Sequence, residues 1–216
     1  MTNPWLRIPL EDYEAHMSLP SIRQAQMLAD QFERLLVRHR PTSVAIVGCA
    51  GGNGLERIEF GQVERVVGMD INPEFIEATR ARHARRLMCL ELHTADVQSK
   101  TLQFEPVELI FAALLFEYVD VQSALATLRR NCAPRGRMAT VLQLFSADQA
   151  AVSPSPYGSL GLLAPIIRLV APAELSRHAQ TAGFALEESK TITLPSGKRF
   201  ELQNFRTIPS PPGAPP

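Results

Sequence analysis

A cluster of glycines after a short apolar run is the first candidate site for ligand chemistry. Residues 44–47 are Val, Ala, Ile and Val, and Gly48, Gly51, Gly52 and Gly54 follow within seven positions. Glycine permits a positive φ and lets a ligand approach the backbone closely. A strand, a glycine turn and a helix in this order cradle nucleotide-like ligands in open α/β sheets. The alternative is an ordinary strand-to-helix turn.

Two aspartates at the ends of predicted strands favour the ligand-binding interpretation. Asp70 lies 22 positions after Gly48, where a carboxylate accepts hydrogen bonds from the hydroxyls of a bound ribose. Asp96 follows the third predicted strand, and its carboxylate could accept a hydrogen bond from an adenine amino group lying against Val97. The alternatives are a helix cap for Asp70 and an exposed loop residue for Asp96.

The elements that must position these residues follow a regular β-α rhythm. Apolar, β-branched runs predict strands, and apolar residues at helical spacing predict helices. The predicted strands are 44–47, 65–70, 87–92, 107–112, 137–144, 185–194 and 198–206, and the predicted helices are 19–38, 72–85, 120–130 and 172–183. This order predicts an α/β, Rossmann-like fold, with a mainly parallel seven-stranded sheet and an antiparallel C-terminal hairpin.

The helix boundaries have their own signals. Ser18 or Ser21 is expected to cap the first long helix. Asn72 as cap with Pro73 at the first helical position opens the next one, and Asp120 caps a third.

One domain is expected, over residues 21–208. Residues 1–20 precede it as an apolar segment that can form one or two helical turns at 11–17. Residues 146–172 are rich in Pro and Gly and form an insertion, with a short helix near 159–169. The tail, 209–216, is Pro-rich and predicted to be disordered.

Composition excludes several function classes. Lys+Arg and Asp+Glu are balanced at 22 each in 216 residues, so no net charge favours nucleic acid or an anionic membrane. The three cysteines are scattered, which fits a reducing compartment rather than a disulfide framework or zinc site. No signal peptide and no membrane-spanning run is visible. We expect a cytoplasmic protein that binds no metal.

Taken together, the chain resembles the class I S-adenosylmethionine-dependent methyltransferases over about residues 20–208. The resemblance lies in five motifs in the expected order: 47–54, 67–73, 94–97, 107–119 and 133–137. It implies S-adenosylmethionine as cofactor and methyl transfer as activity.

The resemblance also implies roles for individual residues. Gly48, Ala50 and Gly52 would wrap the methionine portion of the cofactor, and Asp70 would hold its ribose. Contacts with the adenine and methionine groups are implied for Ile71, Asp96, Val97 and Ala112.

The chain departs from the family pattern at two positions. Ala50 replaces the middle glycine, and Ile46 stands where many members carry an acid that serves the amino end of the cofactor. An N-terminal segment often covers the cofactor in this family. Tyr13 of that segment could therefore reach the cofactor carboxylate and partly replace the acid, and His16 is a candidate base. A surface histidine and a core tyrosine are the alternatives.

The acceptor remains open at this level. Glu117 follows the fourth strand, where the methyl acceptor usually sits in the family, and is a second candidate base; the alternative is a loop carboxylate. Residues 112–115 lack the Asn/Asp-Pro-Pro-aromatic motif of DNA and protein amino-methylating members, which favours a small-molecule acceptor. The arginines of 80–86 are interpreted as a solvated face.

Two other functions remain as alternatives. An NAD(P)-dependent oxidoreductase would need glycines where Ala50 and Asn53 stand. A non-catalytic binding protein with the same fold would explain Ile46.

Overall fold

The computed structural model describes residues 3–59 and 61–208, so the predicted tail at 209–216 lies outside the described residues. Seven strands form one sheet: β1 Ser43–Val47, β2 Arg65–Asp70, β3 Leu90–Thr94, β4 Val107–Ala113, β5 Cys132–Gln143, β6 Phe184–Thr193 and β7 Arg199–Thr207. The α-helices are α1 Leu10–Ser18, α2 Gln24–His39, α3 Pro73–His83, α4 Val121–Arg130 and α5 Pro172–Thr181. Three 3₁₀ helices are η1 Pro4–Arg7, η2 Leu55–Arg57 and η3 Gly158–Leu163.

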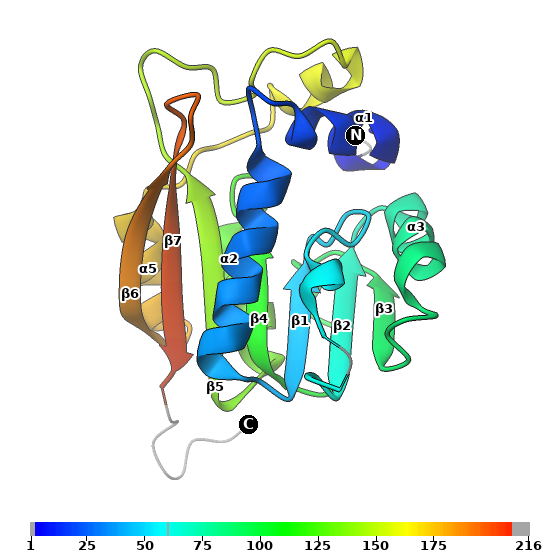
Figure 1. Ribbon diagram of the computed structural model, residues 1–216. Helices are drawn as coiled ribbons and strands as arrows, with labels where there is room; N and C mark the ends of the chain where they lie inside the picture. The colour runs from blue at the N-terminus through cyan, green and yellow to red at the C-terminus, as the bar shows by residue number, and fades with distance from the viewer. Residues whose placement is uncertain (1–2, 60, 209–216) are drawn as a thin grey trace.

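The sheet has the order β3-β2-β1-β4-β5-β7-β6. Strands β1 to β5 pair in parallel, and β7 runs antiparallel to both β5 and β6. In Figure 1 the arrow of β7 accordingly opposes its neighbours. The predicted fold class is confirmed. The strand order reverses between β1 and β4, and ligands bind at the carboxyl ends of the strands at such a switch point.

Both faces of the sheet are covered, because alternate side chains of a strand point to opposite faces. Val44 and Ile46 pack with Phe32 of α2. Ala45 and Val47 belong to the opposite core, which α4 and α5 cover (Figure 1). This burial on both faces explains why β1 is apolar throughout.

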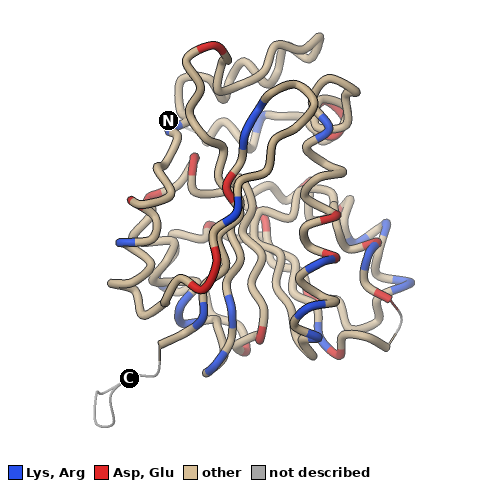
Figure 2. The backbone as a smooth tube through the Cα atoms, turned by 60° about the vertical axis from the view of Figure 1, so that its left-hand side comes forward, with Lys and Arg blue, Asp and Glu red and all other residues tan. Residues whose placement is uncertain are grey.

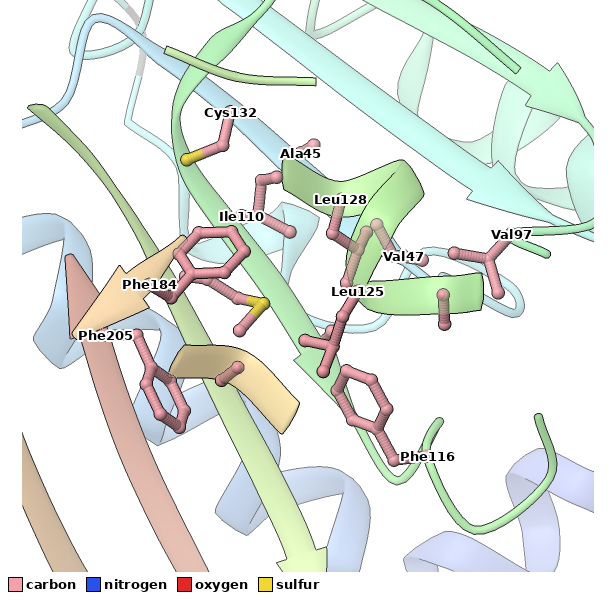
Figure 3. Packing of buried hydrophobic residues seen from close by; sticks show 14 of the residues in the cluster. Ala45, Val47, Val97, Ile110, Phe116, Leu125, Leu128, Cys132, Phe184 and Phe205 are labelled. Atoms are coloured by element: carbon pink, nitrogen blue, oxygen red, sulfur yellow. The ribbon is translucent and has the colours of Figure 1, made fainter. Parts of the chain in front are cut away.

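Aromatic residues fill the core beneath α4 and α5. Figure 3 shows Phe184 beside Ile110, Phe205 on the far side of Phe184, and Phe116 near Leu125. All three phenylalanines are fully buried. Phe184 and Phe205 anchor the start of β6 and the last part of β7 near the amino ends of the parallel strands, whereas Phe116 anchors the loop after β4 at their carboxyl ends.

Several predicted boundaries are confirmed. β2 has the predicted bounds. The Asn72 side chain accepts a hydrogen bond from the Glu74 amide at 2.9 Å, with Pro73 at the first helical position of α3. Asp120 caps α4 by accepting from the Ser123 amide at 2.8 Å.

Other boundaries differ. α2 begins at Gln24, not at 19, and neither predicted serine caps it, because Arg23 precedes it in the left-handed region with φ 52°. β3 begins at Leu90 rather than 87, since the amide of Leu87 still bonds to the His83 carbonyl in the turn after α3. The helix expected near 159–169 is the shorter η3.

β5 starts at Cys132 and includes the predicted turn at 133–136. That turn forms a bulge: Val107 pairs with Cys132, and the next pair is Leu109 with Arg137. Arg135 in the bulge has φ 65°. An irregularity of several residues is therefore accommodated inside a strand that continues on both sides of it.

Charged residues of both signs are interspersed along the chain (Figure 2). Among the described residues, no helix is long and apolar enough to cross a membrane.

Candidate functional site

The glycine loop connects β1 to η2 at the carboxyl edge of the sheet. Gly48, Gly52 and Gly54 have positive φ values of 73°, 91° and 94°. Ala50 also adopts a left-handed conformation, with φ 46°, which costs a non-glycine residue about 1–2 kcal/mol. The backbone therefore keeps the left-handed turn even though the family glycine is replaced.

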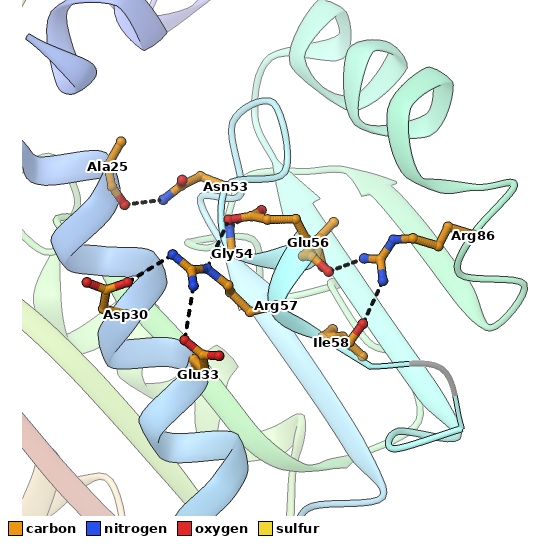
Figure 4. Close-up of polar contacts among 10 residues, drawn as sticks. Ala25, Asp30, Glu33, Asn53, Gly54, Glu56, Arg57, Ile58 and Arg86 are labelled. Carbon is orange, nitrogen blue, oxygen red and sulfur yellow. Dashed lines mark hydrogen bonds and ion pairs between the residues drawn. The ribbon is translucent and has the colours of Figure 1, made fainter.

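A polar network holds the outer end of this loop (Figure 4). The Arg57 guanidinium pairs with Asp30 of α2 at 2.9 Å and with Glu33 at 3.1 Å. From the turn after α3, Arg86 donates to the carbonyls of Leu55 and Ile58. Both helices that flank η2 are thereby joined to it.

Asp70 fixes the inner end of the loop. One carboxylate oxygen accepts from the Ala50 amide and the other from the Asn72 amide, each at 2.9 Å. Burial raises the pKa of Asp70, and the backbone hydrogen bonds oppose that shift. Because each carboxylate oxygen can accept more than one hydrogen bond, Asp70 retains capacity for a ligand while it orders the loop.

A first cavity, cavity A, lies over the carboxyl ends of β1, β2 and β4. Its lining includes the following predicted site residues: Tyr13, Gly48, Ala50, Asp70, Ile71, Asp96 and Val97. Gln98 also lines it, and its amide groups bond to Asp96 at 2.8 Å and 3.1 Å. The structure thus gathers most of the predicted cofactor residues on one hollow.

Ala112 requires a correction. Its side chain is fully buried in the core beneath α4 and α5 and does not line the cavities. The next residue, Ala113, lines cavities A and B instead. Alternate residues of β4 face opposite sides of the sheet, so a shift of one residue moves the side chain away from the site.

A second cavity, cavity B, lies on the other side of the glycine loop and includes Gly52. Glu14 of α1 and Arg82 of α3 form an ion pair across its opening, with one N–O distance of 2.9 Å. Arg82 also donates to the Gly51 carbonyl at 3.2 Å. Arg82, and Arg86 in the turn after α3, therefore do more than form the solvated face predicted for the arginines of 80–86, because both bond to backbone carbonyls of the glycine loop and η2 region.

A third cavity, cavity C, contains both candidate bases. Glu117 is 2% exposed, and one of its oxygens accepts from the Gln143 amide at 2.7 Å. Burial raises the pKa of Glu117 to about 7. His16 is 6% exposed, and burial, with a smaller contribution from Lys198, lowers its pKa. The alternative of a surface histidine is thus wrong for His16, while Glu117 does lie in a loop, between β4 and α4, but is buried there.

Lys198 reaches cavity C from the β6–β7 hairpin. Its ammonium donates to the Ala151 carbonyl and the Ser153 hydroxyl, both at 2.9 Å. Burial lowers the pKa of Lys198 to about 8. Gln143 donates to the same Ala151 carbonyl at 2.9 Å. These bonds fix the first part of the 146–172 insertion over the cavity.

Tyr13 lines all three cavities. Its ring stacks on Phe75 at 6.2 Å between centroids and meets Trp5 edge-on at 5.6 Å. Trp5 in turn meets Tyr118 at 5.0 Å. Burial, followed by the charge of Asp70, raises the pKa of Tyr13. An aromatic cluster therefore separates the cavities, with Tyr13 at their junction.

The N-terminal roof, which is η1 with α1, is attached at several points (Figure 1). The Asn72 side chain donates to the Trp5 carbonyl at 3.0 Å. Ser159 of the insertion donates to Asp12, and Ile8 packs against Leu160. The roof thus joins α3 on one side and the insertion on the other.

Sequence reasoning missed Glu14, Arg82, Gln98 and Lys198. Each is an ordinary polar residue in its own segment; Glu14, Arg82 and Lys198 depend on partners far along the chain, whereas Gln98 bonds to Asp96, two residues before it. No cluster of three His, Cys, Asp or Glu side chains suited to a metal ion occurs in residues 3–59 and 61–208.

Comparisons with known proteins agree on the domain type. A family model described as a methyltransferase domain matches residues 46–140. No curated protein matches the sequence. The N-methyltransferase NodS from Bradyrhizobium japonicum WM9, solved with S-adenosyl-l-homocysteine, aligns over 87% of this chain and 88% of its own, with 18% identity and a TM-score of 0.65.

Two further solved structures are similar. Magnesium protoporphyrin IX methyltransferase from Synechocystis PCC 6803, with bound SAH, aligns over 91% of this chain and 93% of its own, with 12% identity and a TM-score of 0.70. The [4+2]-cyclase SpnF aligns over 87% and 82%, with 12% identity and a TM-score of 0.67. Because one neighbour is named a cyclase, likeness of fold does not by itself define the reaction.

Proposed function

This chain has the fold of the class I S-adenosylmethionine-dependent methyltransferases, as its sequence motifs predicted, and from this premise we propose that it transfers a methyl group from S-adenosylmethionine to a small molecule. The observation that carries the proposal is the position of Asp70. A partly buried carboxylate at the end of β2 both orders the glycine loop and lines an apolar cavity.

Cavity A fits the nucleoside part of the cofactor. Asp70 would accept hydrogen bonds from the ribose hydroxyls. Ile71 and Val97 offer apolar surface for the adenine, and Asp96 an acceptor for its amino group. Gln98 holds the Asp96 carboxylate in place.

Cavity B fits the amino-acid part, which carries one positive and one negative group. Gly48, Ala50 and Gly52 of the glycine loop would wrap this part. Arg82 would attract the carboxylate of the cofactor, and Glu14 its ammonium group. Glu14 would then supply, from α1, the acid that the family often places where Ile46 stands. Tyr13 closes the boundary between the two parts.

When bound, the cofactor supplies a methyl group already activated on a sulfonium. The residues of this chain therefore need mainly to align the reactants and exclude water. The roof and the insertion supply the cover over cavity C, while Glu117 and His16 are the groups able to accept a proton there.

A small molecule is the acceptor that this arrangement favours. Cavity C is bounded by the roof, the insertion and the β6–β7 hairpin, and its polar residues are buried. A hollow walled by three segments suits a compact ligand better than a polymer.

Calorimetry with S-adenosylmethionine and S-adenosylhomocysteine tests the proposal. Both should bind the full chain, and Asp70→Ala should weaken binding by about 1–3 kcal/mol, because the ribose loses a charged acceptor. Asp70→Asn keeps one acceptor oxygen, so it should weaken cofactor binding less than Asp70→Ala does. Asp148→Ala is the control, since Asp148 is exposed and outside cavities A to C.

Two results would reject it. A folded protein that binds neither ligand has no cofactor site, and an unchanged affinity in Asp70→Ala removes the ribose role. Transfer of the methyl group to any acceptor would separate an enzyme from a binding protein of the same fold.

A further inference from the structure

Cavity C contains two buried polar atoms that have no hydrogen-bond partner within the described residues. They are one carboxylate oxygen of Glu117, Oε2, and the Nδ1 atom of His16. Leaving a buried polar atom unpaired costs about 1–3 kcal/mol. Such atoms are uncommon in folded proteins, and each calls for a physical explanation. Here the two line the same hollow.

The Glu117 carboxylate is fixed in orientation. Its other oxygen accepts from the Gln143 amide at 2.7 Å, and the Glu117 carbonyl accepts from the Arg168 amide at 2.8 Å. The residue is thereby bound to the end of β5 and to the end of the insertion. Oε2 cannot turn towards Gln143 without exchanging places with the bonded oxygen.

The other charged and titratable groups around cavity C do not neutralise this oxygen. Lys198 directs its ammonium to Ala151 and Ser153. His16, whose pKa is lowered by burial, is neutral near pH 7. Tyr13 and Tyr118 have pKa values raised by burial and carry no charge there. Two groups of cavity C can therefore carry a charge: the Lys198 ammonium, which is already bonded to Ala151 and Ser153, and the Glu117 carboxylate, whose Oε2 is left for a ligand.

The remaining walls are apolar or aromatic. Trp5 and Tyr118 lie on one side, and Leu160 and Leu163 of η3 on another. These surfaces suit a ligand whose body is uncharged.

We propose that the methyl acceptor is a small molecule with an apolar or aromatic body, whose nucleophile is an amine or hydroxyl group that donates its hydrogen to Glu117 Oε2. This inference rests on the proposed function and adds the chemical class of the acceptor. His16 Nδ1 provides a second polar contact for such a ligand.

The proton and electron pairs balance in this arrangement. The lone pair of the acceptor nitrogen or oxygen forms the new bond to the methyl carbon. The carbon–sulfur bond breaks, and its electron pair stays on sulfur as a neutral thioether. The proton of the nucleophile passes to Glu117 Oε2, so the carboxylate becomes a carboxylic acid and no further reactant is needed.

The same geometry disfavours anionic acceptors. When Glu117 is ionised, a carboxylate or phosphate nucleophile would place a second negative charge beside Oε2 in a buried site, where like charges repel. It would also bring no hydrogen to satisfy Oε2.

Three probes that share one body and differ in one group test this selectivity. They are 2-phenylethylamine, 2-phenylethanol and phenylacetate, whose binding to the full chain is measured by ligand-observed NMR with S-adenosylhomocysteine present. The amine or the alcohol should bind at least about tenfold more tightly than phenylacetate. In Glu117→Gln, which cannot accept the charge-assisted bond, that preference should fall by about tenfold. Glu77→Gln, with a 70% exposed side chain, is the matched control and should keep it.

The outcomes separate this inference from the proposed function. Equal or tighter binding of phenylacetate, no binding of all three probes, or an unchanged preference in Glu117→Gln overturns the inference. The preference of the wild-type chain for the amine or the alcohol over phenylacetate is measured without any variant. It therefore tests the inference even if Glu117→Gln fails to fold. S-adenosylhomocysteine binding, measured alone by calorimetry, reports on the proposed function: without it that function fails, and with it only the acceptor class is in question.

Discussion

Replacing Glu117 with glutamine should change the pH dependence of stability. In the native protein the Glu117 carboxyl has a pKa of about 7, raised by burial from 4.5. The native state therefore binds this proton more tightly than the unfolded chain does. It follows that the wild type is most stable, with respect to this group, below the unfolded pKa, and loses stability as the pH rises towards 7 and beyond.

The size of this effect follows from the two pKa values. The shift of about 2.5 units corresponds to about 3.4 kcal/mol when the whole interval is crossed, at 1.36 kcal/mol per unit. Most of this change falls between about pH 5 and about pH 7.5, where the wild type loses about 2 kcal/mol of its free energy of unfolding. Glutamine does not titrate, and its amide oxygen can still accept from the Gln143 amide. Relative to the wild type, the free energy of unfolding of Glu117→Gln should therefore rise by about 2 kcal/mol as the pH goes from about 5 to about 7.5.

Urea denaturation at both pH values measures this difference. The free energy of unfolding is compared between wild type, Glu117→Gln and the exposed control Glu77→Gln, so that all other titrations cancel. Both pH values lie below the pKa of Lys198, about 8, so that neighbour stays mostly charged, and its partial titration is common to the wild type and the variants. A stability difference between wild type and Glu117→Gln that is the same at both pH values would refute the reasoning, because it would place the pKa of Glu117 near its ordinary value.

Two further changes test the contacts around cavities B and C. Gly51→Ala would place a methyl group 2.2 Å from a Glu14 oxygen and 2.5 Å from an Arg82 nitrogen. Both atoms are at the flexible ends of side chains, so the free energy of unfolding should change by less than about 1 kcal/mol. Calorimetry should nevertheless show weaker S-adenosylhomocysteine binding. Unchanged binding would mean that the Glu14–Arg82 ion pair does not contact the cofactor. Lys198→Met removes the two bonds to the insertion and should speed proteolytic cleavage within 146–172, as timed by mass spectrometry. Cleavage at the wild-type rate would mean that other contacts hold the insertion.

The sheet was predictable because its determinants are local. The run Val44–Val47 is buried on both faces, and its composition shows this directly. Asn72 and Pro73 mark the start of α3 by chemistry that acts within one turn. The sequence order of strands and helices then constrained the topology, since parallel strands with crossover helices have few arrangements.

Errors occurred where the backbone departs from regular geometry. Arg23 adopts a left-handed conformation that its residue type does not predict, so the predicted start of α2 was wrong. The bulge at 133–136 resembles a turn in sequence, but the flanking residues continue the ladder with β4. Ala112 and Ala113 are chemically identical, and only the register of β4 decides which one faces the cavities.

The site was predictable in part. Asp70 and Asp96 follow strands, so the topology itself brings them to one edge. Glu14 and Arg82 are 68 positions apart and meet only because α1 folds back over the glycine loop. Lys198 likewise reaches cavity C, which Glu117 also lines, only through the terminal hairpin. Such pairs depend on tertiary packing, which no local pattern encodes.

The position of Tyr13 also bears on the order of events in a catalytic cycle. Because its ring is a wall of all three cavities, a ligand that fixes it in one cavity changes the free energy of binding in the others. Such coupling is reciprocal: whatever one ligand gains from the other, the other gains equally. Cofactor and acceptor would then share the entropy cost of ordering the roof, and saturation with one would lower the dissociation constant of the other. If release of both products requires α1 to move, roof opening rather than chemistry limits the rate of turnover.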